Sequence, residues 1–440
     1  MNFEESLSYL LSLGHETLAI KLGLRNTELL LEALGNPQRS YEVVQIAGTN
    51  GKGSTATMLD SICRAAGIPT GLFTSPHLRS ITERISIAGR RISEHEFGRL
   101  ATQVREAAER LLAQGKIEAL PTFFEHVTAI ALLAFREAKL ELAILETGLG
   151  GRLDATTVAG AKTVAITRVS LDHQEYLGET IEEIAFEKAG IIHPGVTAII
   201  AEQSTAARDV ILNRCREVGV EASVGGFQAC ELAVSSRGAF AVTFETRNNR
   251  YENVQLSLCG RHQIANAGLA IELAEALRNR GLRISPSNIV RGIESTHHPG
   301  RLTYFDSILV DGAHNPDAAR VLREYLDEFV KEPLTLVFGA MSDKRLVAMA
   351  AILFPRVRYL ILTQPDNPRA ASVESLQTLA ENFLPREKIF AVPNVRAALS
   401  KAKALTSADG RICVTGSLYL VGEASAALYD ESAANAQRSR

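Results

Sequence analysis

The chain has 440 residues, of which 46% are hydrophobic and 22% charged, and its formal net charge is −3. This composition excludes collagen, coiled-coil and disordered chains, and the near-neutral charge excludes the global basic field of a nucleic-acid-binding protein. We therefore expect a globular protein with two domains and no nucleic-acid partner, because a typical domain has about 150 residues.

Five cysteines are spread along the chain without a CxxC pair. Their odd number and spacing disfavour a disulfide framework or a zinc site and are typical of a reducing compartment. The acidic start, Met1 to Glu5, lacks the basic region of a signal peptide, and no apolar run reaches the roughly 18 residues of a membrane span. We expect a cytoplasmic protein without a membrane partner.

Short β-branched runs alternate with longer amphipathic stretches in the first part of the chain. Buried strands are expected at residues 41–47, 140–146, 162–169 and 196–201, with a helix at 54–66 directly after the first strand. Because parallel strands need helical crossovers, this order predicts an α/β fold with a mostly parallel sheet of P-loop type and helices on both faces.

The pattern changes between residues 221 and 258, where short segments alternate apolar and polar side chains. We expect a small antiparallel addition at the edge of the sheet, followed by a helix at about 263–280. The polar stretch 295–301 contains a Pro-Gly pair and is the candidate linker between two domains.

A second series of strands and helices follows this linker. A helix is expected at 316–330, and strands are expected at 307–310, 334–339, 358–363 and 412–415. These elements predict a smaller, Rossmann-like α/β domain over residues 297–440, after a larger domain over residues 1–296.

The strongest motif is a glycine-rich loop between the first strand and its helix. Glycines let the backbone N–H groups approach phosphate oxygens, and the helix N-terminus adds positive charge. The lysine would reach the terminal phosphates and the serine hydroxyl would bind Mg²⁺. The spacing is shorter than in the usual GxxxxGK[ST] loop, and the alternative is a tight turn that binds nothing. The candidate residues are Gly48, Thr49, Asn50, Gly51, Lys52, Gly53 and Ser54.

Three further side chains lie near the predicted ligand crevice. Glu146 ends a strand before a glycine-rich stretch and could bind Mg²⁺, although alone it would be read as a solvated acid. His173 follows the next strand, but histidine is an uncommon Mg²⁺ ligand and a lone histidine is often merely structural or exposed. Lys188 lies near a helix C-terminus, where it could simply complement the helix dipole.

A second candidate cluster opens the second domain. Asp311 and His314 follow its first strand, at the head of a helix, from where an acid and an imidazole could reach a ribose or a phosphate. The pair Asn315-Pro316 independently predicts the start of that helix, with asparagine as N-cap and proline at the first helical position. The capping role can coexist with ligand binding.

An ordered series of motifs runs from about residue 41 to 423 and therefore covers nearly the whole chain. The series includes GTNGKGS at 48–54, TSPHL at 74–78, FFE at 123–125, ETGLGGRLDAT at 146–156, LDH at 171–173, EKAGII at 187–192, PGR at 299–301, DGAHNP at 311–316 and GSLY at 416–419. Together these motifs resemble the folylpolyglutamate synthase and dihydrofolate synthase family of the Mur ligase superfamily.

This resemblance implies an ATP-dependent amide ligase that adds L-glutamate to a folate, and also to dihydropteroate in bifunctional members. The implied reaction forms an acyl phosphate from ATP and a substrate carboxylate, which the glutamate amine then attacks. The resemblance further implies Mg²⁺, a monomeric protein and an ATP-binding role for the larger domain. Domain closure would then assemble the site.

The resemblance also assigns roles to individual positions. Lys52, His173 and Lys188 are implied in catalysis, with Lys188 expected to be carbamylated. The implied metal-site residues are Ser54, Ser75, Glu146, His173 and Lys188. Beyond the phosphate loop, the implied ATP-binding residues are Asn266, Arg301, Asp311 and His314. The implied substrate-pocket residues are Thr122, Phe123, Phe124, Glu125, Leu153, Asp154 and Ala155.

Some positions depart from the family pattern and leave the pterin substrate open. Asp154-Ala155 favours the bifunctional members, whereas Lys21 stands where an acid often lies in those members. Arg168 stands where a serine is frequent. The alternatives are a monofunctional folylpolyglutamate synthase, another Mur-type amino-acid ligase, or a nucleotide-binding switch protein that performs no ligation.

Overall fold

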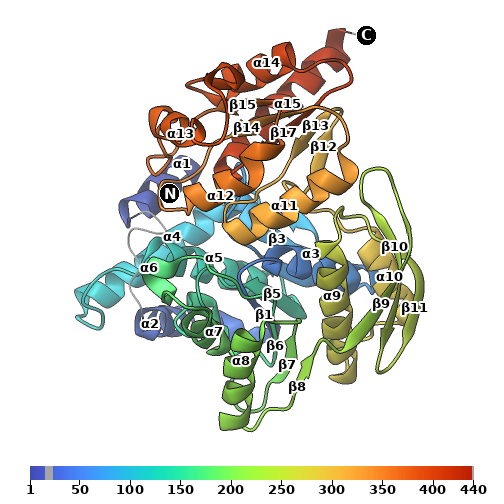
Figure 1. Cartoon of the computed structure of the whole chain (residues 1–440). Helices are drawn as coiled ribbons and strands as arrows, with labels where there is room; N and C mark the ends of the chain where they lie inside the picture. The colour runs from blue at the N-terminus through green and yellow to red at the C-terminus, as the bar shows by residue number, and fades with distance from the viewer. Residues whose placement is uncertain (15–22, 439–440) are drawn as a thin grey trace.

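The computed structural model describes residues 1–14 and 23–438, with backbone alone for residues 432–438. Two sheets dominate it, and a third, small sheet lies to one side (Figure 1). The position of Lys21 lies outside the described residues. No helix in the described ranges is both long and apolar enough to span a bilayer.

The larger sheet has eight strands in the order β4-β3-β2-β5-β1-β6-β7-β8. Pairing from β2 to β8 is parallel, and β3 and β4 are antiparallel at one edge. The strands are β1 (Glu42–Ala47), β2 (Thr70–Phe73), β3 (Ile85–Ile87), β4 (Arg90–Arg91), β5 (Leu142–Glu146), β6 (Thr163–Ile166), β7 (Thr197–Ile200) and β8 (Ala222–Val224). The predicted mostly parallel sheet is confirmed.

Helices cover both faces of this sheet, and each face has its own apolar core. Because side chains alternate along a strand, Val43 of β1 packs in one core and Val44 in the other. One core contains residues of α4 (Glu94–Ala113), α5 (Phe123–Glu137), α7 (Ile181–Ala189) and α8 (Thr205–Glu217). The other contains residues of α3 (Lys52–Ala65), α9 (His262–Asn279) and α10 (Pro286–Glu294).

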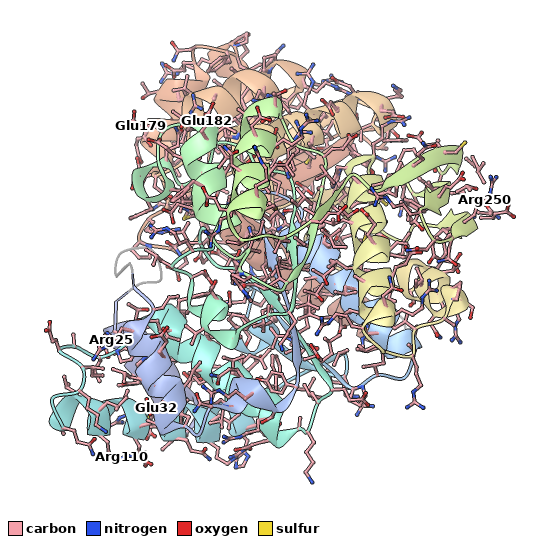
Figure 2. The ribbon with its side chains drawn as sticks, turned by 90° about the horizontal axis from the view of Figure 1, so that it is seen from below. Arg25, Glu32, Arg110, Glu179, Glu182 and Arg250 are labelled. Carbon is pink, nitrogen blue, oxygen red and sulfur yellow. The ribbon has the colours of Figure 1, made fainter. Side chains whose placement is uncertain are left out.

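Shorter helices complete this part of the chain. α1 (Phe3–Ser12) and α2 (Arg25–Ala33) precede β1 and pack near α4, while α6 (Gln174–Leu177) follows β6. Charged side chains, unlike the apolar ones of the two cores, lie on the outside. Figure 2 shows Arg110 of α4, Glu179 and Arg250 projecting from the molecule. The layers are thus apolar between the sheet and its helices and charged on the outside.

The middle segment differs from the prediction. Its strands β9 (Phe227–Val234), β10 (Phe240–Thr246) and β11 (Arg250–Gln255) are antiparallel, as expected, but they form a separate three-stranded sheet. The expected addition to the edge of the main sheet was wrong, because β8 pairs with that edge in parallel. The apolar side of β10 packs instead with α9 and α10 in one core.

The smaller unit is a six-stranded sheet in the order β12-β13-β17-β14-β15-β16, parallel except for β12. Its strands are β12 (Thr303–Phe305), β13 (Ile308–Val310), β14 (Leu334–Phe338), β15 (Tyr359–Leu362), β16 (Ile389–Ala391) and β17 (Arg411–Thr415). Its helices are α11 (Pro316–Phe329), α12 (Leu346–Leu353), α13 (Val373–Ala380), α14 (Val395–Leu405) and α15 (Leu418–Arg438). The predicted second α/β unit is confirmed, while the domain boundary at 297 stays a prediction.

Candidate active site

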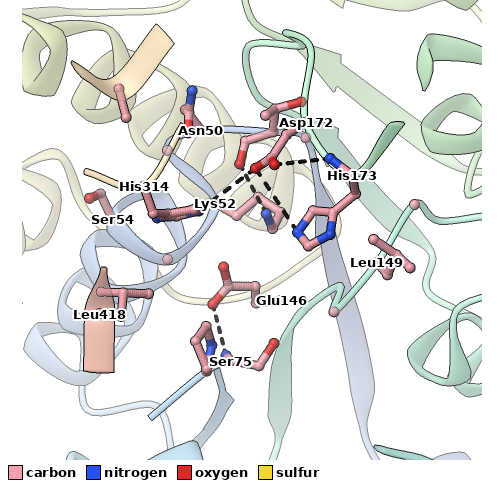
Figure 3. Close-up of a pocket in the computed structure, with 18 of the residues that line it drawn as sticks. Asn50, Lys52, Ser54, Ser75, Glu146, Leu149, Asp172, His173, His314 and Leu418 are labelled. Atoms are coloured by element: carbon pink, nitrogen blue, oxygen red, sulfur yellow. Dashed lines mark hydrogen bonds and ion pairs between the residues drawn. The ribbon is translucent and has the colours of Figure 1, made fainter. Parts of the chain in front are cut away.

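The phosphate-loop motif lies between β1 and α3, as predicted, and lines a cavity of about 400 Å³ (Figure 3). Gly51 precedes α3 with φ 95°. A Cβ at Gly51 would lie 2.4 Å from Asn266 Oδ1, and a Cβ at Gly48 would lie 1.8 Å from Thr167 Oγ1. Both positions therefore require glycine, because the neighbouring side chains touch the backbone of the loop.

Lys52 is the first residue of α3 and lines the same cavity. Its ammonium donates a hydrogen bond to the carbonyl oxygen of Thr49, 3.1 Å away. A cation at a helix N-terminus adds to the positive end of the helix dipole. This end of the cavity is therefore electropositive and suited to phosphates.

Glu146 ends β5 and faces the phosphate loop. Its Oε2 accepts a hydrogen bond from the backbone N–H of Ser75 at 3.1 Å, and a Cβ at Gly53 would lie 3.3 Å from that oxygen. Burial raises the pKa of Glu146, and the charge of Lys52 opposes that rise. A buried carboxylate whose pKa is raised is short of positive charge, which a bound cation would supply.

Lys188 is buried at the back of the loop. Its Nζ donates to the carbonyl oxygen of Gly48 at 2.7 Å. Burial and, secondarily, the charge of Lys52 lower the pKa of Lys188 to about 7. A sizeable fraction of this amine is therefore neutral at physiological pH. A lysine that only complemented the helix dipole would not need a neutral amine.

Asp172 connects the larger unit, which contains the eight-stranded sheet, to the smaller unit. Its Oδ1 accepts from Lys344 Nζ at 2.8 Å, and its Oδ2 accepts from Asn315 Nδ2 at 3.0 Å. Burial alone would raise the pKa of Asp172, but interactions with His173, Lys344 and His314 hold it well below its usual range. At physiological pH both imidazoles are neutral, and the positive charge beside Asp172 is that of Lys344. The carboxylate is thus stably ionised by groups that come mostly from the smaller unit.

His173 follows Asp172 with φ 51°, in the left-handed region, and lines the cavity. Burial lowers its pKa to about 3, so the imidazole is neutral at physiological pH. Its Nε2 lies 3.4 Å from Lys344 Nζ. Figure 3 shows Lys52, Glu146 and His173 among the residues that line the cavity.

The second predicted cluster lines the same cavity, and His314 Nε2 lies 3.7 Å from Asp172 Oδ2. Asp311 accepts hydrogen bonds from the backbone N–H groups of Leu302 and Ala313, each at 3.0 Å, and burial raises its pKa. His314 contacts the Gly312 carbonyl oxygen through Nδ1 at 2.8 Å. Asn315 caps α11, as predicted, by accepting from the N–H of Ala318. Arg301 also lines the cavity.

The Ser54 hydroxyl lies at the start of a chain of polar side chains. Ser54 Oγ is 3.3 Å from His298 Nδ1 and accepts from Gln263 Nε2 at 3.4 Å. Asn266 donates to Gln263 Oε1 at 2.9 Å. Burial lowers the pKa of His298 to about 3 and keeps its ring neutral.

The cavity lining also contains most of the implied substrate-pocket residues. Thr122 and Glu125 form the capping box of α5, and Thr27 donates to Glu125 at 2.8 Å. Asp154 caps the following 3₁₀ turn and is buried. Phe123 does not line the cavity, because its ring packs 5.5 Å from the Arg84 guanidinium. The lining residues of this predicted set are Thr122, Phe124, Glu125, Leu153, Asp154 and Ala155.

The donor set is compatible with Mg²⁺ bound together with a phosphate. Ser54, Ser75, Glu146 and His173 all line one cavity. Within residues 1–14 and 23–438, no group of three or more histidine, cysteine, aspartate or glutamate side chains could alone hold a metal. Mg²⁺ commonly relies on one or two carboxylates, waters and substrate phosphates, so a single buried carboxylate beside hydroxyls fits it.

Sequence reasoning missed the side chains that connect the walls of the site. Asp172 was seen only as part of the LDH motif, and Lys344, Gln263 and His298 were given no role. The partner of each lies far away in the sequence; Lys344 and Asp172, for example, are 172 residues apart. A histidine directly before Pro-Gly-Arg was visible in the sequence, but its contact with the phosphate loop was not.

Two protein families match the chain. The Mur ligase middle domain matches residues 46–274, and the Mur ligase, glutamate ligase domain matches residues 300–418. A Mycobacterium tuberculosis dihydrofolate synthase/folylpolyglutamate synthase is 34% identical over 87% of this chain and 82% of its own length. The chain belongs to the folylpolyglutamate synthase/dihydrofolate synthase family of Mur ligases. The predicted boundary at 297 lies between the two matched ranges.

Solved structures of the family have the same fold. The M. tuberculosis folylpolyglutamate synthase complexed with ADP and AMPPCP superimposes with a TM-score of 0.89 at 32% identity, covering 96% of this chain and 99% of that one. Escherichia coli FolC in complex with DHPP and ADP gives a TM-score of 0.87 at 30% identity, covering 98% and 99%.

Other family members are longer. A probable bifunctional folylpolyglutamate synthase/dihydropteroate synthase of Halobacterium salinarum is 36% identical over 96% of this chain. The chain spans about half the length of that relative and of its Haloferax volcanii counterpart, 51% and 50% respectively.

Proposed function

We propose that this chain is an ATP-dependent amide ligase that joins L-glutamate to a carboxylate of a folate through an acyl phosphate. The observation that carries the proposal is one cavity with two chemically different sets of lining residues. Lys52 and the start of α3 contribute positive charge, whereas Phe124 and Leu153 contribute apolar surface. Such a cavity suits a triphosphate together with a flat, partly apolar acid.

The first chemical step transfers the γ-phosphoryl group of ATP to a carboxylate oxygen of the folate and releases ADP. The glutamate amine then attacks the acyl carbon, an amine proton is lost, and inorganic phosphate leaves with that carboxylate oxygen. Phosphoryl transfer chiefly needs alignment and charge neutralisation. Lys52 and the start of α3 line the cavity and would provide both.

Ser54, Ser75, Glu146 and His173 are the proposed Mg²⁺-site residues. When bound, the metal ion would neutralise charge on the transferring phosphates. Glu146 supports this role because burial raises the pKa of its carboxylate even though Lys52 and the Ser75 N–H oppose that rise. The His173 ring faces Lys344 Nζ with Nε2 at 3.4 Å in this structure, and the metal ion would have to take over the lone pair of that nitrogen.

Lys188 is the proposed carbamylated residue. A neutral lysine amine attacks CO₂ and releases a proton, giving an anionic carbamate. The lowered pKa of Lys188, about 7, favours the neutral amine. The carbamate nitrogen keeps one N–H, which can still donate to the Gly48 carbonyl oxygen. NMR with ¹³C-bicarbonate should give a carbamate signal that Lys188→Arg lacks; an unchanged spectrum in the variant would reject this assignment.

Dihydropteroate is the second proposed substrate, which would make the enzyme bifunctional. The supporting observation is that Asp154 and Ala155 both line the cavity. We further propose that the chain works as a monomer in the cytoplasm, where its five cysteines, all free among the described residues, would stay reduced. Light scattering coupled to size-exclusion chromatography would detect a dimer if one forms.

The decisive experiment measures ADP release with tetrahydrofolate or dihydropteroate, each with and without L-glutamate. Ligation predicts ADP release that needs both the pterin and the amino acid. Equal ADP release without either acceptor would instead indicate a nucleotide-binding switch. Turnover with a cell-wall precursor but not with a pterin would indicate another Mur-type ligase.

A further inference from the structure

The segment that leads into the smaller unit contacts the phosphate loop through one side chain. His298 Nδ1 lies 3.3 Å from Ser54 Oγ, and its ring packs against the loop so closely that a Cβ at Gly53 would lie 3.1 Å from His298 Cε1. The neighbouring His297 is exposed. Only one of two adjacent histidines is therefore placed to act on the loop.

The neighbours of Gln263 fix the direction of one hydrogen bond to Ser54. Asn266 donates to Gln263 Oε1, which turns the amide N–H groups of Gln263 toward His262 and Ser54. Ser54 Oγ thus accepts one hydrogen bond from Gln263. Its own proton can then be donated to His298 Nδ1, which accepts it in the tautomer that carries the ring proton on Nε2.

This arrangement determines how many lone pairs of Ser54 Oγ stay free for another ligand. A hydroxyl has one proton and two lone pairs. With the proton given to His298 and one lone pair used by Gln263, one lone pair stays free for a cation in the cavity. In the opposite tautomer, His298 would donate to Ser54, both lone pairs would be used, and Ser54 could not bind a metal ion.

We propose that His298 is a positioning residue that takes the Ser54 hydroxyl proton and thereby presents a Ser54 lone pair to the nucleotide-bound Mg²⁺. The proposal rests on the proposed Mg²⁺–nucleotide role of this site. Hydrogen-bond partners of metal ligands orient those ligands, and their loss typically weakens metal binding about 10- to 100-fold. The same contact ties the connecting segment to the phosphate loop.

The test compares ADP binding by calorimetry in excess Mg²⁺ and in EDTA, without folate or glutamate. His298→Leu should weaken Mg²⁺–ADP binding about tenfold and leave metal-free ADP binding unchanged. His298→Asn should restore Mg²⁺–ADP binding, because its side-chain oxygen can occupy the place of Nδ1. His297→Leu is the matched control and should match the wild type. Equal weakening of binding in EDTA, or no rescue by asparagine, would overturn the proposal.

Two further measurements separate positioning from packing. In a Ser54→Ala background, His298→Leu should cause no additional loss of Mg²⁺–ADP affinity, and an additive loss would overturn the proposal. In the wild type, ¹⁵N-histidine NMR should find the His298 proton on Nε2; a proton on Nδ1 would contradict it without any variant. These readouts contain no ligation step, so failure of the proposed ligase activity would leave them unaffected.

Discussion

Two buried carboxylates close to one another in the cavity have opposite electrostatic surroundings. Glu146, after β5, accepts one backbone hydrogen bond, and burial raises its pKa. Asp172, in the loop after β6, has Lys344 at 2.8 Å and Asn315 at 3.0 Å, and its pKa is held well below the usual range.

This difference in surroundings gives the two carboxylates different roles. Asp172 receives its positive charge from the protein and holds the two large units together. Glu146 is left with an electrostatic deficit, which a cation arriving with the nucleotide would remove. Structural and ligand-binding carboxylates can thus be distinguished by asking whether the chain itself supplies the counter-charge.

The largest expected effect comes from removing the carboxylate that lacks a counter-charge. Glu146→Ala should lower the ligation rate by at least about 10²–10³-fold at saturating ATP and Mg²⁺, because a metal ligand is lost. Steady-state ADP release coupled to product analysis would measure it. Glu141→Ala, at an exposed position just before the same strand, is the control. Equal ligation rates in Glu146→Ala and Glu141→Ala would contradict the distinction drawn between Glu146 and Asp172.

Lys52→Ala should reduce ligation by a similar or somewhat smaller factor, about 10²-fold. The variant removes the ammonium that would neutralise phosphate charge and that opposes the pKa rise of Glu146. The same assay applies, with exposed Lys116→Ala as the control. A ligation rate unchanged by Lys52→Ala would show that the loop does not carry the triphosphate.

Lys344→Met tests the other carboxylate. It leaves Asp172 buried without its nearest cation, so the free energy of unfolding should fall by about 3 kcal/mol. Urea denaturation followed by circular dichroism would measure this, and the neighbouring exposed Arg345→Met should change stability by less than about 0.5 kcal/mol. Equal effects of the two variants would mean that the ion pair does not hold the units together.

Glu146→Gln should raise the free energy of unfolding of the nucleotide-free protein by about 1 kcal/mol at pH 7. The pKa of Glu146 is raised on folding, so its ionised form destabilises the folded state, and the gain should shrink as pH falls. Asp172→Asn should do the reverse: it destabilises at pH 7, and its effect fades below about pH 4, where carboxyls in the unfolded chain are protonated. Variants that shift stability in the same direction at pH 7 would contradict the comparison.

Local patterns were sufficient for much of the fold. The run 41–47 predicted β1, and the following glycines and lysine predicted the loop before α3. The placement of β9–β11 failed because an alternating pattern shows which face is buried but not which element buries it. Here α9 covers that face, and β8 occupies the edge of the main sheet.

The candidate site, like the fold, could be predicted from the sequence only in part. The phosphate loop could be predicted because its residues are consecutive and its chemistry is local. The links among Asp172, Asn315 and Lys344 could not, since they depend on how the smaller unit docks on the larger one. Phe123 lies outside the cavity lining because consecutive helical side chains point in different directions, and Phe124 takes the inward position.

The most direct test of the central claim follows one oxygen atom. A folate whose reacting carboxylate carries ¹⁸O at both oxygens is incubated with ATP, Mg²⁺ and L-glutamate, and the released phosphate is analysed by mass spectrometry. If the phosphate loop and the apolar lining of the cavity serve one acyl-phosphate reaction, each phosphate released in product formation should carry one ¹⁸O atom. Product formation with unlabelled phosphate would contradict the account.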